Sequence, residues 1–394
     1  MKPDRIDELI AVYRDGLLED TLPFWTRHAI DREHGGFLFC LDHDGRVVDT
    51  DKGLWQHGRF TWLLATLHNT VEPREEWLEL ARHGVEFLRR HGFDDDGRML
   101  FQVTREGAPL RKRRYVFTEA FAAIAFAAYA RASGDERAAH DARRLFREML
   151  RHGTTPGLIP PKVDPRTRPC KSIGFPMIAL ATAQVMRDDL CDPLAEEWID
   201  RSIDEIRRDF VSPELEVVLE TVGPNGELID HFDGRTLNPG HALEAAWFIL
   251  AEARHRGGDA QLEQLGSSMV DWMWRRGWDE EHGGLFYFRD LHGGPVQEYW
   301  HDMKFWWPHN EAVLATLMAY RATGEMRFAE WHREVHDWAH RSFADPENGE
   351  WFGYLHRDGR RSVSLKGNLW KGPFHLPRMQ LVAWKTLEEM RDEN

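Results

Sequence analysis

The chain has 394 residues, of which 42% are hydrophobic and 30% are charged, so it can bury a large core and is neither disordered nor of low complexity. Its formal net charge of −15 at pH 7, with no concentrated block of Lys and Arg, excludes a nucleic-acid-binding surface. No run of eighteen apolar residues occurs, which excludes a membrane-spanning helix, so we expect a small molecule as the partner.

The N-terminal segment and the cysteines indicate a cytoplasmic protein. Residues 1–25 have an amphipathic spacing broken by charges and lack the apolar core and cleavage site of a signal peptide. Cys40, Cys170 and Cys191 lack metal-ligand spacing, and their odd number is typical of free, buried thiols in a reducing compartment. The 17 Trp and 21 His residues exceed the needs of a core, and both types suit a sugar site.

Segments with helical apolar spacing follow one another along the whole chain and come in pairs. They span residues 5–24, 53–69, 75–91, 115–132, 137–151, 171–188, 194–209, 239–256, 260–276, 301–322, 326–341 and 370–390. Between them, aromatic-rich runs bounded by Gly predict short β-hairpins at residues 34–48, 96–110, 282–294 and 348–360. Twelve paired helices with hairpins on one side predict an all-α fold, an (α/α)6 barrel or six-hairpin toroid, as a single domain over residues 1–394.

The predicted inner and outer helices differ in composition. Inner helices begin with polar or aromatic groups that can face a central cavity and continue in small and apolar residues, as in 53–67, 117–130, 238–250 and 306–320. Residues 325–340 are charge-studded instead, which is typical of an outer helix. His332, His336 and His340 recur there every four residues, but the HExxH order of a metal site is absent, so we expect a solvated face.

The first candidate site motif is LWQHGRF, residues 54–60. Trp55 and Arg59 are separated by four residues and therefore share one helical face. Together they offer a stacking surface and a fixed fork of N–H donors for sugar hydroxyls or for a developing oxyanion. For any single Trp, core filling is the better explanation, but Arg59 is flanked by apolar residues, and a buried charge needs a partner or a ligand.

Three carboxylates lie around a turn in ETVGPNGELIDHFDGR, residues 220–235. Glu227, Asp230 and Asp233 can supply the paired acids of a glycoside hydrolase, a common class among six-hairpin toroids. Turn and capping roles explain the same residues. Both interpretations stay open at this point.

The stretch NPGHALEAAWFIL, residues 238–250, reads as a helix start, with Asn238 as the cap and Pro239 in the first turn. His241 therefore lies in the opening turn, where the helix dipole favours a neutral imidazole that can accept a proton. Glu244 lies three residues on, and we expect it to hold the imidazole in one tautomer. A capped helix with a half-buried structural His fits the pattern equally well.

Two further motifs resemble helix starts beside a cavity. KFWWPHNEA, residues 304–312, contributes Trp307 and Glu311, the latter a charge among apolar neighbours, together with Trp306 and His309. KGNLWKGPFHLPRMQ, residues 366–380, places His375 between two prolines and close to Arg378, and a stiff backbone holds a reacting group in place. An ordinary loop with a surface His is the alternative. Neither GxxxxGK[ST] nor a strand-GxGxxG-helix unit occurs, so we expect no nucleotide cofactor and no metal.

These motifs together resemble the N-acylglucosamine 2-epimerase family, which includes N-acetylglucosamine 2-epimerases, cellobiose 2-epimerases and mannose isomerases. The resemblance covers essentially the whole chain. It rests on LWQHGRF, GRTLNPGHALEAAWF, KFWWPHNEA, ENGEWFGYLHRDG and KGNLWKGPFHLPR. It implies a barrel of six helical hairpins, a homodimer, His241 and His375 as the catalytic pair, and a substrate site lined by Trp55, Arg59, Glu244, Trp307 and Glu311, with Arg378 beside His375.

The resemblance also implies the chemistry. The sugar ring opens, one His takes the C2 proton, and an enediolate forms. Return of a proton to the opposite face of C2 gives the 2-epimer, whereas delivery to C1 gives the ketose. The leading hypothesis is a sugar 2-epimerase of the N-acetylglucosamine/N-acetylmannosamine type, and an aldose–ketose isomerase is the alternative. A glycoside hydrolase or a non-catalytic carbohydrate-binding protein ranks below both.

One segment departs from part of the family pattern. In SIGFPMIALATA, residues 172–183, Met177 stands where cellobiose epimerases and mannose isomerases carry a substrate-facing His, and Ile173 stands where they carry an Asn. The departure resembles the N-acetylglucosamine-type branch. A less polar wall suits an N-acyl methyl group.

Overall fold

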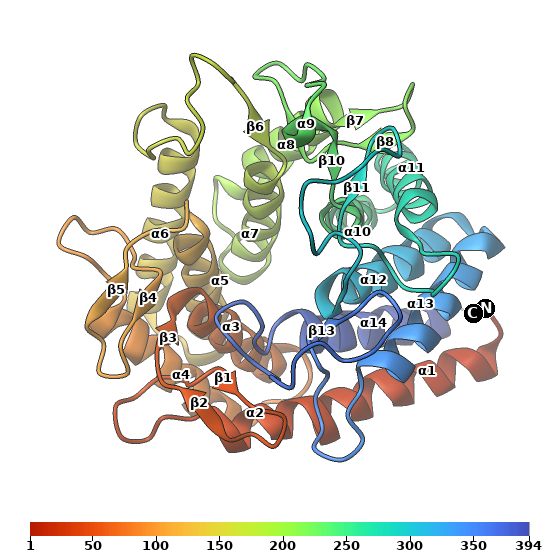
Figure 1. Ribbon diagram of the computed structural model, residues 1–394. Coiled ribbons are helices and arrows are strands. Elements are labelled where there is room, and N and C mark those ends of the chain that lie inside the picture. The colour runs from red at the N-terminus through yellow and green to blue at the C-terminus, as the bar shows by residue number, and fades with distance from the viewer. Residues whose placement is uncertain (394) are drawn as a thin grey trace.

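The computed structural model describes residues 1–393 and shows an (α/α)6 barrel (Figure 1). Six inner helices form a ring in which each contacts the next along the chain. They are α3 (Leu54–Thr70), α5 (Phe117–Ser133), α7 (Gly174–Leu190), α10 (Pro239–His255), α12 (Trp306–Thr323) and α14 (His375–Asp392). The outer helices that cover them are α4 (Glu75–His91), α6 (Glu136–Thr154), α8 (Ala195–Glu205), α11 (Ala260–Gly277), α13 (Met326–Phe343) and α1 (Pro3–Asp15).

The inner and outer helices have the compositions that their places require. Helix α5 is buried on every side from Thr118 to Ala130, which accounts for its near-continuous small and apolar sequence. Helix α6 instead buries one apolar face and exposes a charged one. The predicted helix over residues 5–24 continues further, because a π-helical turn, Gly16–Thr21, joins α1 to α2 (Leu22–His28). No helix within residues 1–393 is long and apolar enough to cross a membrane.

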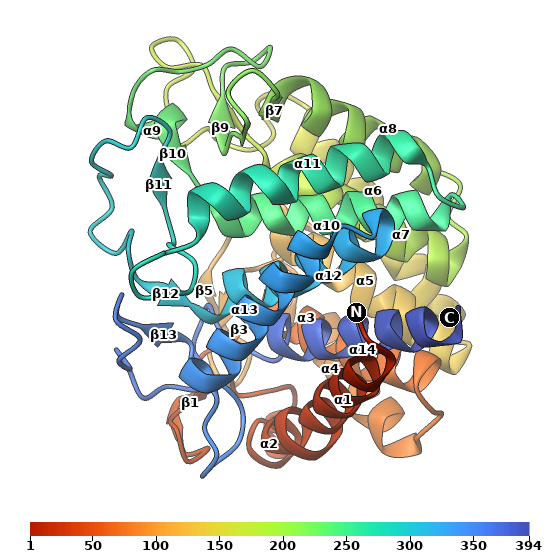
Figure 2. The ribbon, with the colours of Figure 1, turned by 90° about the vertical axis from the view of Figure 1, so that its right-hand side faces the viewer.

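Short strands fix the starting points of four inner helices, and Figure 2 shows the strands gathered at one end of the barrel. Strands β3 (Lys52–Gly53), β6 (Lys171–Ser172), β10 (Thr236–Leu237) and β12 (Lys304–Phe305) directly precede α3, α7, α10 and α12. Their antiparallel partners are β4 (Gln102–Val103), β9 (Thr221–Val222), β11 (Arg289–Asp290) and β13 (Tyr354–Leu355). Each of these helices therefore begins at a position anchored by backbone hydrogen bonds.

Three of the four predicted hairpins are confirmed. Strand β1 (Cys40–Leu41) pairs with β2 (Val47–Asp49), and β4 pairs with β5 (Pro109–Arg111). In the segment 348–360, the backbone N–H of His356 donates to Arg360 O, and Leu355 and Arg361 form an antiparallel bridge, so a short hairpin is present there. The hairpin predicted at 282–294 is wrong as a self-paired unit, because β11 pairs with β10, the strand before α10. Strands β7 (Val211–Ser212) and β8 (Val217–Val218) form a hairpin that the sequence did not predict, and the short helix α9 (Phe232–Arg235) precedes β10.

The first turns of α3 and α12 each contain a buried histidine that binds a neighbouring loop. The Nε2 atom of His57 accepts a hydrogen bond from the backbone N–H of Phe37, and the Nε2 atom of His309 accepts one from Leu285. Burial lowers the pKa of both imidazoles to about 3, so both are neutral. His309, which lies in a candidate site motif, is therefore a structural residue that anchors the 282–294 loop.

The histidine stripe on α13 is buried, so the expectation of a solvated face is wrong. His332 and His336 are only 1% and 6% exposed because α1 packs over them. The hydroxyl of Tyr13 on α1 lies 3.1 Å from His332 Nε2 and 2.8 Å from His336 Nδ1. Burial, with the charge of Arg5 nearby, lowers the pKa of His332 to about 3.

This arrangement predicts a loss of stability in acid. As the pH falls from about 6.5 toward 3, the unfolded chain binds a proton at His332 before the folded chain does, so the free energy of unfolding decreases. The substitution His332→Gln should reduce the slope of the unfolding free energy against pH by up to about 1.4 kcal/mol per pH unit. Urea titrations across this range measure the slope, with the exposed His140→Gln as the control. An unchanged slope in His332→Gln would contradict the interpretation.

Candidate functional site

A cavity of about 1280 Å³ runs along the barrel axis, lined by the inner helices and by the loops at their N-terminal ends. Seven of the eight site residues predicted from the sequence line it: Trp55, Arg59, His241, Glu244, Trp307, His375 and Arg378. Glu311 does not line the cavity. It is fully buried directly behind His375, so its predicted role as a lining residue is wrong.

His241 lies in the first turn of α10, as predicted. Its backbone N–H donates to the side chain of Asn238, the N-cap of that helix. The imidazole opens onto the cavity, and 36% of its side-chain surface is accessible. Its Nδ1 atom lies 3.0 Å from a carboxylate oxygen of Glu220, not of Glu244 as expected. Since a carboxylate only accepts, Nδ1 carries the proton in this hydrogen bond.

Glu220 shifts the pKa of His241 in the direction opposite to the one expected. Burial disfavours the imidazolium, but the charge of Glu220 and its hydrogen bond outweigh burial and raise the pKa of His241 above its usual value. The helix start had predicted a neutral ring. The reversal arises because Glu220 belongs to the loop between β8 and β9, which the sequence pattern did not connect to α10.

Replacing Glu220 by Gln keeps an acceptor for the Nδ1–H group of His241 but removes the negative charge. We therefore expect the pKa of His241 to fall, because the imidazolium loses its counter-charge inside the barrel, where desolvation already disfavours it. An NMR pH titration of the His241 ring protons measures the change. Glu227→Gln, in the loop that follows β9, is exposed and bonded to Asn225; it is the matched control and should leave the titration unaltered. An unchanged pKa in Glu220→Gln would refute the assignment.

His375 is the first residue of α14 and has the opposite environment. Its Nδ1 atom lies 2.7 Å from Glu311 Oε1, so Nδ1–H donates to the carboxylate and Nε2 keeps its lone pair. Burial and the positive charge of Arg378 lower the pKa of His375 well below its usual value, and Arg59 acts in the same direction. His375 is therefore a neutral base at pH 7.

Arg378, one turn further along α14, joins two carboxylates. Its Nη2 atom donates to Glu244 Oε1 and to Glu311 Oε1, each at 2.6 Å. Glu311 also accepts a hydrogen bond from Trp247 Nε1 at 2.7 Å. Only 6% of the Arg378 side chain is exposed, and the three charges form one network in the cavity wall, with Glu311 behind the lining residues.

Arg59 and Trp55 form one wall of the cavity on α3. The guanidinium of Arg59 lies 4.2 Å from the ring centre of Trp55 and 4.1 Å from that of Phe121. Within residues 1–393 it has no carboxylate partner, and its buried Nε atom has no hydrogen bond. Burial and the charge of Arg378 lower the pKa of Arg59 to about 9. A cation with free donors beside the histidines is suited to an anion that develops during a reaction.

Trp307 contacts both histidines. Its ring centre is 5.1 Å from that of His241 and 5.7 Å from that of His375. The two imidazole centres are therefore at most about 11 Å apart, the sum of those distances. The sequence predicted that the two histidines face one cavity, and the structure places both on its lining.

The carboxylates considered for glycoside hydrolysis lie elsewhere. Glu227, Asp230 and Asp233 are exposed and do not line the cavity. Asp230 pairs with Arg235, and Asp233 pairs with Arg168. They act as turn and surface residues, so the geometry does not support a hydrolase built on them.

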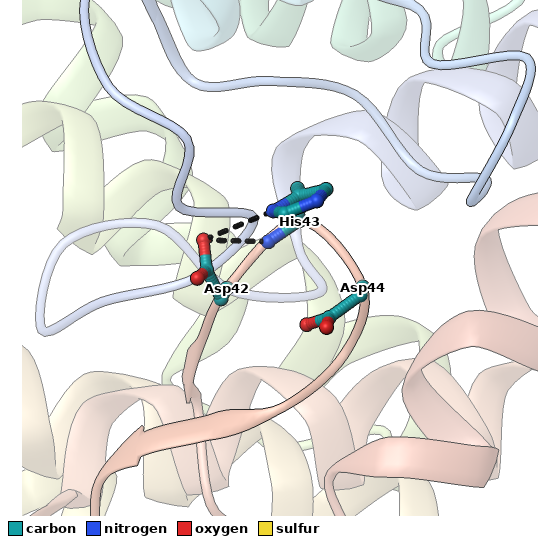
Figure 3. Close-up of side chains that lie close together, drawn as sticks. All are labelled: Asp42, His43 and Asp44. Atoms are coloured by element: carbon teal, nitrogen blue, oxygen red, sulfur yellow. Dashed lines mark hydrogen bonds and ion pairs between the residues drawn. The ribbon is translucent and has the colours of Figure 1, made fainter.

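Within residues 1–393, two groups of side chains have ligand atoms close enough for a cation. The first, Asp42, His43 and Asp44, forms the exposed turn between β1 and β2 (Figure 3). Asp42 there accepts hydrogen bonds from the Ser364 hydroxyl, the Arg46 guanidinium and the His43 backbone, which account for its position. Turn geometry therefore explains this group.

The second group is Glu244, Glu311 and His375, inside the site. The guanidinium of Arg378 already bonds both carboxylates, and the Nδ1–H group of His375 occupies Glu311 Oε1 as well. The positive charge that a metal would supply is thus provided by an arginine. We assign no metal to either group.

Comparison with known proteins gives one consistent result. Residues 35–375 match the family model described as N-acylglucosamine 2-epimerase (GlcNAc 2-epimerase). The N-acylglucosamine 2-epimerase of Bos taurus is 36% identical over 98% of this chain and 94% of its own.

Solved structures show the same fold. A cellobiose 2-epimerase from Bacillus thermoamylovorans superposes with a TM-score of 0.84 at 20% identity, covering 97% of this chain and all of its own. A D-mannose isomerase superposes with a TM-score of 0.82 at 19% identity, covering 94% of this chain and 97% of its own. At these sequence identities the structural similarity establishes the fold and nothing more.

Proposed function

The chain belongs to the N-acylglucosamine 2-epimerase family, and from this premise we propose that it interconverts N-acetylglucosamine and N-acetylmannosamine at C2. It is a sugar 2-epimerase and thus an isomerase that acts on carbohydrates. The observation that carries the proposal is the pair of histidines beside Trp307, with pKa values shifted in opposite directions. A base and an acid in one cavity are what inversion at a carbon acid requires.

In the proposed mechanism, the neutral His375 accepts the C2 proton of the open-chain aldose at Nε2. The electron pair of the C2–H bond forms the C1–C2 double bond, and the carbonyl electrons move to O1, giving an enediolate or its 2-acylamino counterpart. His241, whose protonated form Glu220 favours, then donates a proton to C2 from the opposite face. In the reverse direction the two histidines exchange roles, as microscopic reversibility requires.

The surrounding residues stabilise the charges of this cycle. Arg59 offers unpartnered N–H donors to the oxyanion at O1. Glu311 keeps Nδ1 of His375 protonated, so Nε2 is the reactive atom, and Arg378 offsets the carboxylate charge that would otherwise favour the imidazolium. Trp307 supplies a flat face for the sugar between the two rings.

Met177 supports the choice of an N-acyl sugar. It is 5% exposed and lines the cavity on α7. An apolar side chain there suits an acyl methyl group, whereas a plain C2 hydroxyl would lack a hydrogen-bond partner at that wall. We therefore propose N-acetylglucosamine and N-acetylmannosamine ahead of mannose, glucose and cellobiose.

Product analysis tests the proposal. The purified protein is incubated separately with N-acetylmannosamine, mannose, glucose, fructose and cellobiose in D2O, and the products are followed by NMR. We expect N-acetylglucosamine from N-acetylmannosamine, with deuterium at C2 and no ketose. Fructose as the first product from mannose, without turnover of the acylated sugar, would establish an aldose–ketose isomerase instead.

We further propose that the protein works in the cytoplasm as a homodimer. Cys40, Cys170 and Cys191 form no disulfide, as in a reducing compartment, although Cys191 is exposed, so the expectation that all three thiols are buried is wrong. The homodimer rests on the family resemblance. Light scattering of the purified protein should give twice the chain mass of 46.1 kDa.

A further inference from the structure

Arg114 lines the same cavity, and the mechanism leaves it without a role. It stands three residues before helix α5, in the loop that follows β5. In the part of the chain that the structure describes, its guanidinium has no carboxylate within ion-pair distance and no hydrogen-bond acceptor, and its Nε atom is buried without a partner. A guanidinium has five N–H donors, and buried donors are normally hydrogen-bonded. Arg114 is unusual because its donors have no acceptor among residues 1–393 of the protein.

Aromatic rings hold this guanidinium in place. It lies 4.7 Å from the ring centre of Trp370 and 5.7 Å from that of Trp55. The residue that follows, Tyr115, has a φ of 55°, a strained conformation for a bulky side chain. The fold therefore fixes Arg114 beside the cavity at some cost in backbone strain, and burial lowers its pKa in the absence of a compensating carboxylate.

Arg114 lies nearer the solvent than Arg59 does. The two arginines share Trp55 as a neighbour, but the other contacts of Arg59 include Phe374, which is 4% exposed and adjacent to His375. Trp370, the other contact of Arg114, is 42% exposed. Arg59 thus belongs to the reacting end of the cavity, and Arg114 belongs to its mouth.

We propose that Arg114 is a substrate-binding residue that donates hydrogen bonds to the oxygen atoms of the sugar remote from C2, at C4 and C6. This inference rests on the proposed function. With C2 between His241 and His375, the far end of an open-chain hexose points toward the mouth of the cavity. Its hydroxyl oxygens supply the acceptors that Arg114 lacks, and the indoles of Trp55 and Trp370 flank the carbon chain.

Binding of a non-reacting sugar alcohol tests the inference. N-acetylglucosaminitol has no C1 carbonyl and cannot be epimerised, so calorimetry measures its affinity independently of turnover. Arg114→Met keeps a side chain that packs against the indoles but removes every donor. Because a charge-assisted hydrogen bond is lost, we expect its Kd to rise by about 10- to 100-fold. The exposed Arg111→Met, three residues earlier, is the matched control and should bind as wild type does.

Deoxy analogues separate hydrogen bonding from a packing role. Removing O4 or O6 from the alditol should weaken binding to the wild type but not to Arg114→Met, since the partner of that oxygen is already gone. In turnover, Arg114→Met should raise KM while kcat stays within about 3-fold of the wild type. The inference would be overturned if both deoxy analogues lost the same affinity for the wild type as for Arg114→Met. A lower kcat of Arg114→Met at unchanged KM would also overturn it.

The two proposals fail differently. Wild-type protein that binds the alditol with the expected coupling to Arg114, yet epimerises no aldose, would overturn the proposed function and leave the binding role of Arg114 intact. Epimerisation with no coupling between Arg114 and the distal oxygens would do the reverse.

Discussion

Replacing His375 by Asn is expected to lower kcat for 2-epimerisation by about 10²- to 10⁴-fold, the usual contribution of a positioned general base. The amide cannot accept the C2 proton, although it can still donate to Glu311 from a similar position. His241→Asn is expected to have a loss of the same order, because an acid is needed on the other face in every turnover. Steady-state rates with N-acetylmannosamine measure both effects.

The matched control is His140→Asn, since His140 is exposed on the outer helix α6 and far from the cavity lining. It should retain wild-type rates. Either active-site variant with more than a tenth of wild-type kcat would show that the histidine is not the proton-transferring group.

Removing Arg378 is expected to affect both stability and catalysis. Arg378→Met leaves Glu244 and Glu311 buried without their counter-charge, and breaking one partner of a buried ionic network costs about 3–5 kcal/mol of unfolding free energy. Arg378 also lowers the pKa of His375, so its loss raises that pKa. His375 must be unprotonated to act, and the acid limb of the kcat/KM profile should therefore move to higher pH.

Urea unfolding and a pH–rate profile measure the two effects of Arg378→Met separately. Arg391→Met, near the exposed end of the same helix, is the control and should change neither. An acid limb at the wild-type position, in a variant that still folds, would contradict the electrostatic role given to Arg378.

The barrel could be predicted from the sequence because the apolar spacing that identifies each helix is a local property of that segment. Apolar spacing identifies a helix wherever one face is buried, and all twelve predicted helices are present near their predicted positions. The errors in the predicted helices lie at their first residues. The segments 301–322 and 370–390 begin later, at Trp306 and His375, because β12 and a proline-bracketed turn occupy the preceding residues. The hairpin at 282–294 was mispredicted because strand pairing is a non-local choice.

The site shows the same difference between local patterns, which a sequence reveals, and tertiary contacts, which it does not. His241 and His375 were identifiable because each opens an inner helix, and the ring of helices brings those ends together. Glu220 was missed because no spacing links its loop to α10. Glu244 shares a helical face with His241, but its carboxylate accepts a hydrogen bond from Arg378, 134 residues away in the sequence. Side-chain partners of this kind depend on tertiary contacts that a single sequence does not display.

The histidines of α13 show how a charged pattern can mislead. Charges surround His332 and His336 in the sequence, which suggested solvent on that face. The outer ring of the barrel, however, closes with α1, whose Tyr13 supplies a hydroxyl between the two imidazoles. A histidine stripe is compatible with burial when a hydroxyl satisfies it, and the sequence gives no sign of which helix will cover it.

Exchange of the C2 proton in D2O, measured separately for each epimer in His241→Asn and His375→Asn, tests the central claim most directly. Two bases on opposite faces predict that each variant, although unable to epimerise, exchanges the C2 proton of one epimer only, and that the two variants select opposite epimers. Exchange of both epimers by either variant, or of the same epimer by both, would show that His241 and His375 do not serve opposite faces of C2.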